Sequence, residues 1–341
     1  MTTPSIHEAR QLTIGVHPFT NEGNEYIPIN KDILGQLGSV VEVPRARVLL
    51  KRLLGQLIRF KSPKSFDVLI LNWTELLILS RGNAPTLSGA ISYLFLMRLC
   101  RWVAVKLIYV RHNDYPHDLP RRHQRQIRNL IAKGQRLADA VVAHSPVYAE
   151  EHGYHYVPHP LYRLDPGGQA SECDEYVIFG RVMAYKKIDQ LIEAWPSSQH
   201  LAVIGPFTDE DYLAKLRSMA LDKPIRFDIG FHDEGALVDR LKASRGVIIV
   251  NDPGSLVVSG TFFFALSVGV GVLAINNSFY SWVKTTPLDE YVQSFDSIPA
   301  LARHLQERPA RESAQPELIR SEARRLFGDD AVLQAWRSLI C

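Results

Sequence analysis

The sequence is poor in cysteine, with three residues in 341 that stand far apart, in none of the spacings typical of metal sites. An odd number of scattered thiols indicates a reducing compartment rather than a disulfide framework. The first ten residues lack the apolar core of a secretory signal peptide, and the chain has neither an internal repeat nor a low-complexity segment. These absences predict a cytoplasmic protein, or one on the cytoplasmic face of a membrane.

One long stretch, residues 253–283, has no charged side chain. Its length raises the question of a transmembrane helix, but small polar residues and glycines interrupt it. Residues 259–261 are typical of a helix N-terminus, and Gly269 and Gly271 would end the apolar run within about three turns. We therefore predict a loop, a short helix, a glycine turn and a buried strand. The start of that helix would present backbone N–H groups that attract phosphate.

At 341 residues, with 46% hydrophobic and 22% charged side chains, the chain is typical of a globular protein of two domains. Its net charge of +3 hides an asymmetry. Residues 1–165 carry 21 Lys and Arg against 13 Asp and Glu (+8), whereas residues 166–341 carry 18 against 23 (−5). A basic first half can meet anionic lipid, a phosphorylated substrate or nucleic acid. The sequence has no basic motif interleaved with aromatic residues, so we expect no nucleic-acid partner.

Strand-like and helix-like segments alternate along both halves, which is typical of α/β proteins with doubly wound parallel sheets. The irregular segment LDPGGQASECDE separates the halves. We predict two Rossmann-like domains, residues 1–165 and 166–341, that face a central cleft. The helical tail from residue 317 would pack across both.

The segment 45–64 combines an apolar face with many basic residues. Its apolar residues recur at helical spacing: Leu49, Leu50, Leu53, Leu54, Leu57 and Ile58. Seven basic residues surround them. Two interpretations stay open: a surface helix that packs one face on a sheet, and an interfacial helix that lies on an anionic membrane.

Titratable side chains gather at two strand ends of the first half. The strand-like run FDVLILNW ends just before Glu75, and VKLIYV runs into RHNDYPHD. Open α/β sheets bind ligands at the carboxyl ends of their strands. We therefore expect a catalytic or acceptor-binding loop whose candidate residues are Glu75, His112, Asn113, Asp114, His117 and Asp118.

The strand ends of the second half hold a different set of residues. Arg181 and Lys186 are five positions apart across a strand-to-helix turn, so both side chains can reach one spot. Together with the helix start at residues 259–261, they would form a site for a diphosphate. The complete candidate set is Gly180, Arg181, Lys186, Gly205, Phe231, His232, Ser259, Gly260 and Thr261.

The segment FGRVMAYKKIDQLIEAW resembles the strand–Gly-Arg–Lys–helix segment with which GT-B glycosyltransferases hold the donor diphosphate, with Lys187 where a glycine is usual. Taken in order, LNWTEL, RHNDYPHD, FGRVMAYKK and SGTFFFALS are similar to motifs of bacterial exopolysaccharide mannosyltransferases of the xanthan β-mannosyltransferase type. The resemblance implies a GT-B fold and a peripheral enzyme on the inner face of the plasma membrane. It implies transfer of mannose from GDP-mannose to a lipid-linked glycan acceptor. The acceptor would bind to the domain of residues 1–165, and the nucleotide sugar to the domain of residues 166–341.

One departure from retaining GT-B enzymes bears on the mechanism. Those enzymes carry two glutamates eight positions apart around this helix, whereas the aligned positions here hold Leu256 and Phe264. The difference favours inversion at the anomeric carbon, or an inactive relative. Inversion needs a base. Asp118 stands where the resemblance puts an acid, with His112 or His117 orienting the acceptor hydroxyl.

Positive charge for the leaving diphosphate would come from Arg181, Lys186 and the amides of residues 259–261, so we expect no metal cofactor. Three alternatives stay open. The chain can be a retaining glycosyltransferase, a GT-B sugar-nucleotide epimerase, or a non-catalytic GT-B-like subunit of a membrane synthase.

Overall fold

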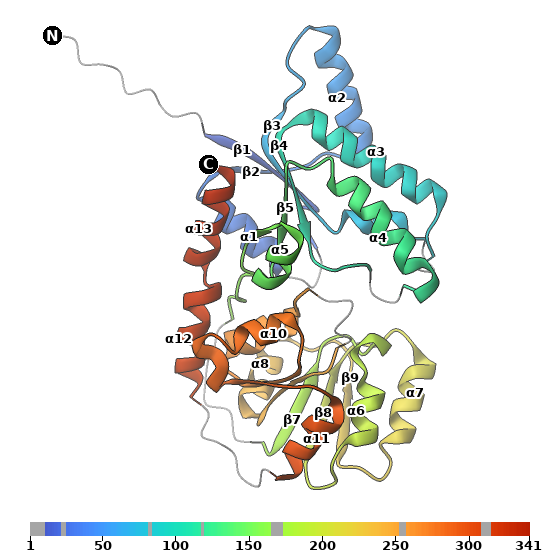
Figure 1. Ribbon diagram of the computed structural model, residues 1–341, viewed down its shortest axis with the longest axis vertical. Helices are drawn as coiled ribbons and strands as arrows, with labels where there is room; N and C mark the ends of the chain where they lie inside the picture. The colour runs from blue at the N-terminus through green and yellow to red at the C-terminus, as the bar shows by residue number, and fades with distance from the viewer. Residues whose placement is uncertain are drawn as a thin grey trace, which may run out of the picture. The chain divides into compact units, whose positions relative to one another are not determined.

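The computed structural model describes residues 11–21, 25–80, 84–116, 119–164, 173–251, 257–307 and 315–341. These residues form two six-stranded sheets, each flanked by helices (Figure 1). Neighbouring strands run parallel from β2 to β4 in the first sheet and from β12 to β9 in the second. The predicted α/β architecture with two doubly wound sheets is confirmed.

The first sheet has the strand order β2-β1-β3-β4-β5-β6. Its central strands, β3 and β4, are buried over most of their length, because their apolar residues follow one another almost without interruption. The strands are β1 (Leu12–His17), β2 (Gly38–Glu42), β3 (Phe66–Asn72), β4 (Ala104–Arg111), β5 (Ala140–Ala143) and β6 (His155–Tyr156). The helices of this part of the chain are α1 (Tyr26–Gly35), α2 (Ala46–Ile58), α3 (Leu87–Val103), α4 (Arg121–Gln135) and α5 (Pro146–His152).

Helices α2, α3 and α4 lie side by side (Figure 1). Of the six apolar residues expected on one face of α2, Leu49 and Leu53 are buried, whereas Leu54 and Leu57 are about half exposed, at 51% and 52%, and Ile58 is 77% exposed. The buried face is therefore narrower than the periodicity predicts, and much of the apolar surface of α2 faces away from the core.

The second sheet has the strand order β12-β11-β10-β7-β8-β9. Helices α6, α7 and α11 share one hydrophobic core with it, and α8, α9, α10 and α12 share another. From β7 the chain builds the sheet outward through β8 to β9. It then returns to the other side of β7 and adds β10, β11 and β12 in the opposite direction, so the strand order switches between β7 and β10. The strands are β7 (Glu175–Phe179), β8 (His200–Gly205), β9 (Ile225–Ile229), β10 (Gly246–Ile249), β11 (Val272–Ile275) and β12 (Val292–Phe295). The helices are α6 (Ile188–Ala194), α7 (Glu210–Met219), α8 (Glu234–Ala243), α9 (Gly260–Val268), α10 (Ser278–Val283), α11 (Ile298–Glu307), α12 (Pro316–Phe327) and α13 (Asp329–Ile340).

The chain forms two compact units that are not simple halves. One comprises residues up to Arg111, Arg121–Val142 and Leu333–Cys341, and the other comprises His112–Pro120 and Ala143–Val332. The predicted linker lies mostly outside the described residues, and the division at residue 165 stays a prediction. The strand-end loop that begins at His112 groups with the unit of the second sheet, although we expected it to belong to the first domain.

From residue 257 on, the uncharged stretch folds as its small residues predict, and the start of the predicted loop lies outside the described residues. Helix α9 ends at Gly269, whose φ of 87° is a left-handed conformation that glycine adopts without strain, and β11 follows. Ser259 is the N-cap residue, but its side chain makes no capping hydrogen bond, contrary to the usual role of serine there. Phe262 and Phe263 are fully buried. None of the helices within the described residues is long and apolar enough to cross a membrane.

The tail, predicted as one helical segment, consists of two helices that are separated at Gly328. A Cβ atom on Gly328 would meet the Arg324 carbonyl oxygen at 2.4 Å, so a larger residue does not fit this bend. The end of α13 belongs to the unit of the first sheet, where the Trp336 indole nitrogen donates to the Asn30 side-chain oxygen at 3.1 Å. Packing of the tail across both domains stays a prediction.

Candidate functional site

A hollow of about 210 Å³ opens at the point where the second sheet reverses its strand order. Doubly wound sheets bind their ligands at such a switch point, outside the carboxyl ends of the strands. The hollow is lined by Ile178, Phe179, Lys186, Ile248, Ile249, Val250, Asn251 and Thr261. The unit of the second sheet therefore has an open hollow at the position that its topology predicts.

Lys186 supplies a buried positive charge to this hollow. Its side chain is 6% exposed, and its ammonium group donates a hydrogen bond of 2.8 Å to the Phe179 carbonyl oxygen. Burial, helped by the nearby Arg181 guanidinium, lowers the pKa of Lys186 to about 8. At neutral pH the ammonium group is still mostly charged. Two neighbouring cations, with no acidic side chain among the described lining residues, favour an anionic ligand.

Two glycines shape the turn that carries Arg181. Gly180 and Gly205 have φ values of 88° and 134°, which side chains rarely adopt. A Cβ atom on Gly205 would lie 2.5 Å from the Gly180 carbonyl oxygen, so the two turns touch through their backbones. The Val182 amide also donates to the Pro206 carbonyl oxygen at 2.8 Å. The strand-end turns after β7 and β8 thus form one tightly joined edge, on which Arg181 is exposed.

Lys187, where GT-B enzymes usually have glycine, adopts a left-handed φ of 50°. Few residues other than glycine adopt this conformation without strain, which explains why glycine is usual there. The chain keeps the turn despite the bulkier residue.

Thr261, in the first turn of α9, lines the hollow. The first amides of a helix have no partner within the helix, so this turn faces the hollow with hydrogen-bond donors. A Cβ atom on Gly260 would approach the Tyr162 hydroxyl at 3.2 Å. The structure thus brings Lys186 and the start of α9 together, as expected.

Phe231 and His232 do not line this hollow. They follow β9 at the edge of the sheet, where the Phe231 side chain is 93% exposed. The His232 ring nitrogen lies 3.2 Å from the Asp228 carbonyl oxygen. Their place in the candidate set of the second half stays a prediction.

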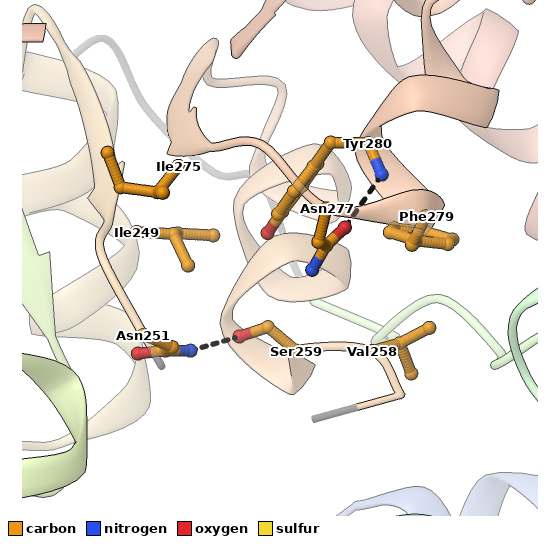
Figure 2. Close-up of a pocket in the computed structure, with 8 residues that line it drawn as sticks. All are labelled: Ile249, Asn251, Val258, Ser259, Ile275, Asn277, Phe279 and Tyr280. Atoms are coloured by element: carbon orange, nitrogen blue, oxygen red, sulfur yellow. Dashed lines mark hydrogen bonds between the residues drawn. The ribbon is translucent and has the colours of Figure 1, made fainter. Parts of the chain in front are cut away.

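A second hollow, of about 300 Å³, lies between the ends of β10 and β11, beside the start of α9. Its lining residues are Ile249, Asn251, Val258, Ser259, Ile275, Asn277, Phe279 and Tyr280 (Figure 2). The two hollows share Ile249 and Asn251 and therefore adjoin. The sequence analysis expected Ser259 here but missed Asn251, Asn277 and Tyr280. The position of both asparagines just after a strand end was the signal that could have found them.

His112 belongs to a row of buried rings that the sequence analysis did not foresee. The ring centres of His112 and His144 are 5.2 Å apart, and those of His144 and His159 are 5.4 Å apart. His159 stacks on Phe263 of α9 with ring centres at 4.3 Å. Burial and the neighbouring histidines hold the pKa of His112 well below its usual range, and burial lowers the pKa of His144 to about 4 and that of His159 to about 3. His112 is therefore neutral at physiological pH.

These histidines predict acid sensitivity. Their folded-state pKa values lie below the ordinary value, so they stabilise the fold fully above about pH 6.5 and lose that contribution as the pH falls toward 4. We expect the free energy of unfolding to fall by about 2 kcal/mol or more between about pH 6.5 and about pH 5. Urea unfolding at both pH values would measure this. His159→Phe should reduce the pH dependence of the free energy of unfolding. His200→Gln, which changes an exposed histidine, should leave that pH dependence as it is. An equal pH dependence in the native protein and both variants would contradict the prediction.

The other first-half candidates have distinct environments. Glu75, in the unit of the first sheet, is 4% exposed and accepts a hydrogen bond of 2.6 Å from the Tyr109 hydroxyl, and its burial raises its pKa. Asp114 accepts a hydrogen bond from the Tyr148 hydroxyl. His117 and Asp118 lie outside the described residues. Within the described part of the chain, no group of three or more His, Cys, Asp or Glu side chains is placed to hold a metal ion.

No family model and no curated protein matches the chain, but solved structures match nearly its whole length. Sucrose-phosphate synthase from Thermosynechococcus elongatus matches with a TM-score of 0.66 at 13% identity, covering 97% of this chain and 99% of that one. HepE from Anabaena, solved with UDP and glucose, matches with a TM-score of 0.62 at 15% identity, covering 96% of this chain and 99% of that one. AviGT4, a glycosyltransferase involved in avilamycin A biosynthesis, matches with a TM-score of 0.54 at 15% identity, covering 96% of this chain and 97% of that one.

These similarities establish the fold, which is the GT-B fold of two Rossmann-like domains. The predicted fold class is confirmed. The narrower resemblance to exopolysaccharide mannosyltransferases stays a prediction, because it depends on motifs that the structural similarity does not test.

Proposed function

We propose that the protein is a glycosyltransferase that takes its sugar from a nucleoside-diphosphate donor. The observation that carries this proposal is the buried ammonium group of Lys186 at the switch point of the second sheet, next to Arg181 and the first turn of α9. A diphosphate matches this arrangement, because it offers negative charge both to the cations and to the helix N-terminus. HepE, with a similar fold, was solved with UDP and glucose, which supports a nucleotide-sugar donor.

In the proposed reaction, the oxygen of an acceptor hydroxyl attacks the anomeric carbon of the donor sugar. The bond between that carbon and the phosphate oxygen breaks, the nucleoside diphosphate leaves, and the hydroxyl proton passes to a base. Arg181, Lys186 and the start of α9 would stabilise the negative charge on the leaving diphosphate. The proposal therefore includes no metal cofactor.

For the substrates, we propose GDP-mannose and a lipid-linked glycan acceptor in exopolysaccharide or cell-surface glycan synthesis, on the strength of the four motifs. We propose inversion with Asp118 as base. Phe264 supports inversion, because this residue stands where retaining relatives carry a glutamate. Its ring is 9% exposed and packs on Phe179 and Tyr162, with ring centres at 5.3 Å and 5.1 Å. No carboxylate is available at this position.

Incubation with GDP-mannose, UDP-glucose and UDP-galactose tests the proposed activity. We expect one donor to be consumed and its nucleoside diphosphate to be released. A sugar-nucleotide epimerase would instead change the sugar without releasing a nucleoside diphosphate. A non-catalytic subunit would bind a nucleoside diphosphate but consume no donor.

We propose a peripheral position on an anionic membrane, with helices α2 and α3 at the surface of contact. On α2 and just after it, Ile58 is 77% and Phe60 is 99% exposed, and on α3, Leu87 is 80% and Ile91 is 60% exposed. Helices α2, α3 and α4 carry no acidic residue, whereas each carries basic ones. Apolar side chains framed by basic residues suit the surface of an anionic membrane.

Flotation with anionic vesicles tests this position. We expect the protein to float at low salt and less at moderate salt, and the double variant Ile58→Glu/Phe60→Glu to lower the bound fraction about tenfold or more. Leu221→Glu, which changes an 80% exposed leucine in the other unit, should float like the native protein. Equal binding to neutral vesicles, or no flotation, would favour a plain surface helix.

A further inference from the structure

A row of buried rings connects the loop that follows β4 with helix α9. The ring contacts run from His112, the first residue of that loop, through His144 to His159, with ring centres 5.2 Å and 5.4 Å apart. His159 then stacks face to face on Phe263 of α9, with ring centres at 4.3 Å and an angle of 8° between the planes. All four residues belong to the unit of the second sheet. These contacts attach the start of the loop to this unit, although the loop follows a strand of the first sheet.

Hydrogen bonds to the backbone fix the two middle rings of the row. The Nδ1 atom of His144 lies 2.8 Å from the Val157 carbonyl oxygen, and that of His159 lies 2.8 Å from the Pro160 carbonyl oxygen. A carbonyl oxygen only accepts, so Nδ1 carries the hydrogen in both rings. Burial holds the pKa of both rings below the ordinary value, so they are neutral at physiological pH and contact each other without charge repulsion.

The segment that carries His159 is joined to α9 at a further point. The Tyr162 amide donates a hydrogen bond of 2.9 Å to the Ser267 hydroxyl, which in turn donates to the Phe263 carbonyl oxygen at 2.7 Å. The backbone of this segment is therefore tied to the same helix on which the His159 ring stacks. A displacement of α9 carries the segment with it.

Helix α9 also provides part of the proposed diphosphate site. Thr261, two residues before Phe263, lines the Lys186 hollow. Because backbone hydrogen bonds keep one turn of a helix rigid, the position of Phe263 fixes that of the first turn. The row thus has the proposed diphosphate site at one end, and at the other end the loop with the candidates for acting on the acceptor.

The polarity of the row needs a reason beyond packing. Burying an imidazole costs free energy that a phenylalanine ring of similar size does not cost. Unlike a phenylalanine ring, however, a hydrogen-bonded imidazole is held in one orientation. Supports whose own side chains are locked by packing and hydrogen bonds are what keeps functional groups in place.

We propose that His144 and His159 are positioning residues, which hold the loop that begins at His112 in a fixed place relative to α9 and so align the acceptor hydroxyl with the donor diphosphate. This inference rests on the proposed function, since it takes the diphosphate to lie at Lys186 and the acceptor at the loop. His144 is fully buried, so it acts through the loop and α9 without touching either substrate.

Kinetics and calorimetry of His144→Phe test the inference. Phenylalanine keeps a ring at this position but removes the hydrogen bond to the Val157 carbonyl oxygen. For the donor that the native protein consumes among GDP-mannose, UDP-glucose and UDP-galactose, we expect turnover to fall about tenfold or more, because a small misplacement of reacting groups slows a reaction strongly. The affinity for GDP or UDP should stay within about twofold, because Arg181 and Lys186 lie outside the row.

Amide hydrogen exchange distinguishes positioning from a merely structural role. When GDP or UDP binds to the native protein, we expect exchange in a peptide that covers residues 112–116 to slow about threefold or more, because the row connects that segment to α9. His144→Phe should still bind the nucleoside diphosphate but lose this slowing. A residue that only stabilises the fold would leave the slowing in place.

Trp195→Phe is the matched control. Trp195 is buried in the other core of the same unit, and its ring nitrogen donates to the Gln199 carbonyl oxygen at 2.7 Å. The variant therefore loses a buried bond between a ring nitrogen and a carbonyl oxygen, away from the row. We expect it to lower the melting temperature but to keep native turnover and native slowing of exchange.

The outcomes separate this inference from the function on which it rests. If the native protein binds neither GDP nor UDP, the proposed function fails and the inference fails with it. If one binds but exchange at residues 112–116 does not change, or if His144→Phe keeps native turnover and native slowing, only the inference is overturned. Should His144→Phe fail to fold, His144→Asn replaces it, since its amide can donate to the same carbonyl oxygen while the ring contacts are lost. Should both fail, the exchange of the native protein with and without nucleoside diphosphate decides.

Discussion

Replacing Asp118 by asparagine is expected to lower turnover about 100-fold or more while donor affinity stays unchanged. Asparagine keeps the size of the side chain and much of its hydrogen bonding, but it cannot accept the proton that the acceptor hydroxyl loses. The prediction follows from the motif RHNDYPHD, since Asp118 lies outside the described residues. Steady-state rates and calorimetry of donor binding would measure the two effects separately.

The described candidates provide comparators for Asp118. Asp114 and Glu75 are each held by a tyrosine hydroxyl, from Tyr148 and Tyr109 respectively. These hydrogen bonds give each carboxyl group a role in holding the fold together. We therefore expect Asp114→Asn and Glu75→Gln to lower thermal stability more than they lower turnover. A near-normal rate for Asp118→Asn would contradict its role and pass the search to Asp114, His117 and Glu75.

Removing the charge of Lys186 is expected to weaken nucleoside-diphosphate binding by roughly 1.5–3 kcal/mol, the range of charge-assisted hydrogen bonds. Lys186→Met keeps most of the buried stem and removes only the ammonium group, and Arg181→Ala should have an effect of similar size. Calorimetric titration of the variants with GDP and UDP would measure the loss.

Lys215→Met is the control for this prediction. Lys215 lies in the same unit, and its ammonium group pairs with Asp189 at 2.7 Å, outside the residues that line either hollow. Its removal should leave nucleotide affinity as it is. Unchanged affinity in both Lys186→Met and Arg181→Ala would remove the diphosphate site from this turn.

Local signals in the sequence predicted much of this site. The order of loop, helix α9, glycine turn and strand β11 followed from Gly269 and from the small residues at 259–261, because each acts on its own few residues. The Lys186 hollow followed from the rule that parallel strands collect ligands at their carboxyl ends. Both predictions depend on spacing along the chain, which a single sequence contains.

What the sequence did not predict depends on packing between distant segments. Tyr280 lines the second hollow, where its ring packs against Phe262, 18 positions earlier. The row of His112, His144 and His159 depends on contacts between three separate segments, of which the last also stacks on Phe263 of α9. Likewise, the leucine periodicity of α2 predicted a helix but not which residues face the core, since Leu53 is buried and Leu54 is half exposed.

The binding of a nucleoside diphosphate at a buried lysine is tested most directly by titrating GDP and UDP into the native protein and Lys186→Met at about pH 7 and about pH 9.5. Burial, helped by Arg181, lowers the pKa of Lys186 to about 8, so the free ammonium group is charged at the lower pH and neutral at the higher. A bound diphosphate favours the charged form, and binding above the pKa must take up a proton. We predict that native affinity falls by about tenfold or more across this range, whereas the variant binds weakly at both pH values. Native affinity that is equal at both pH values and matched by the variant would contradict the proposed site.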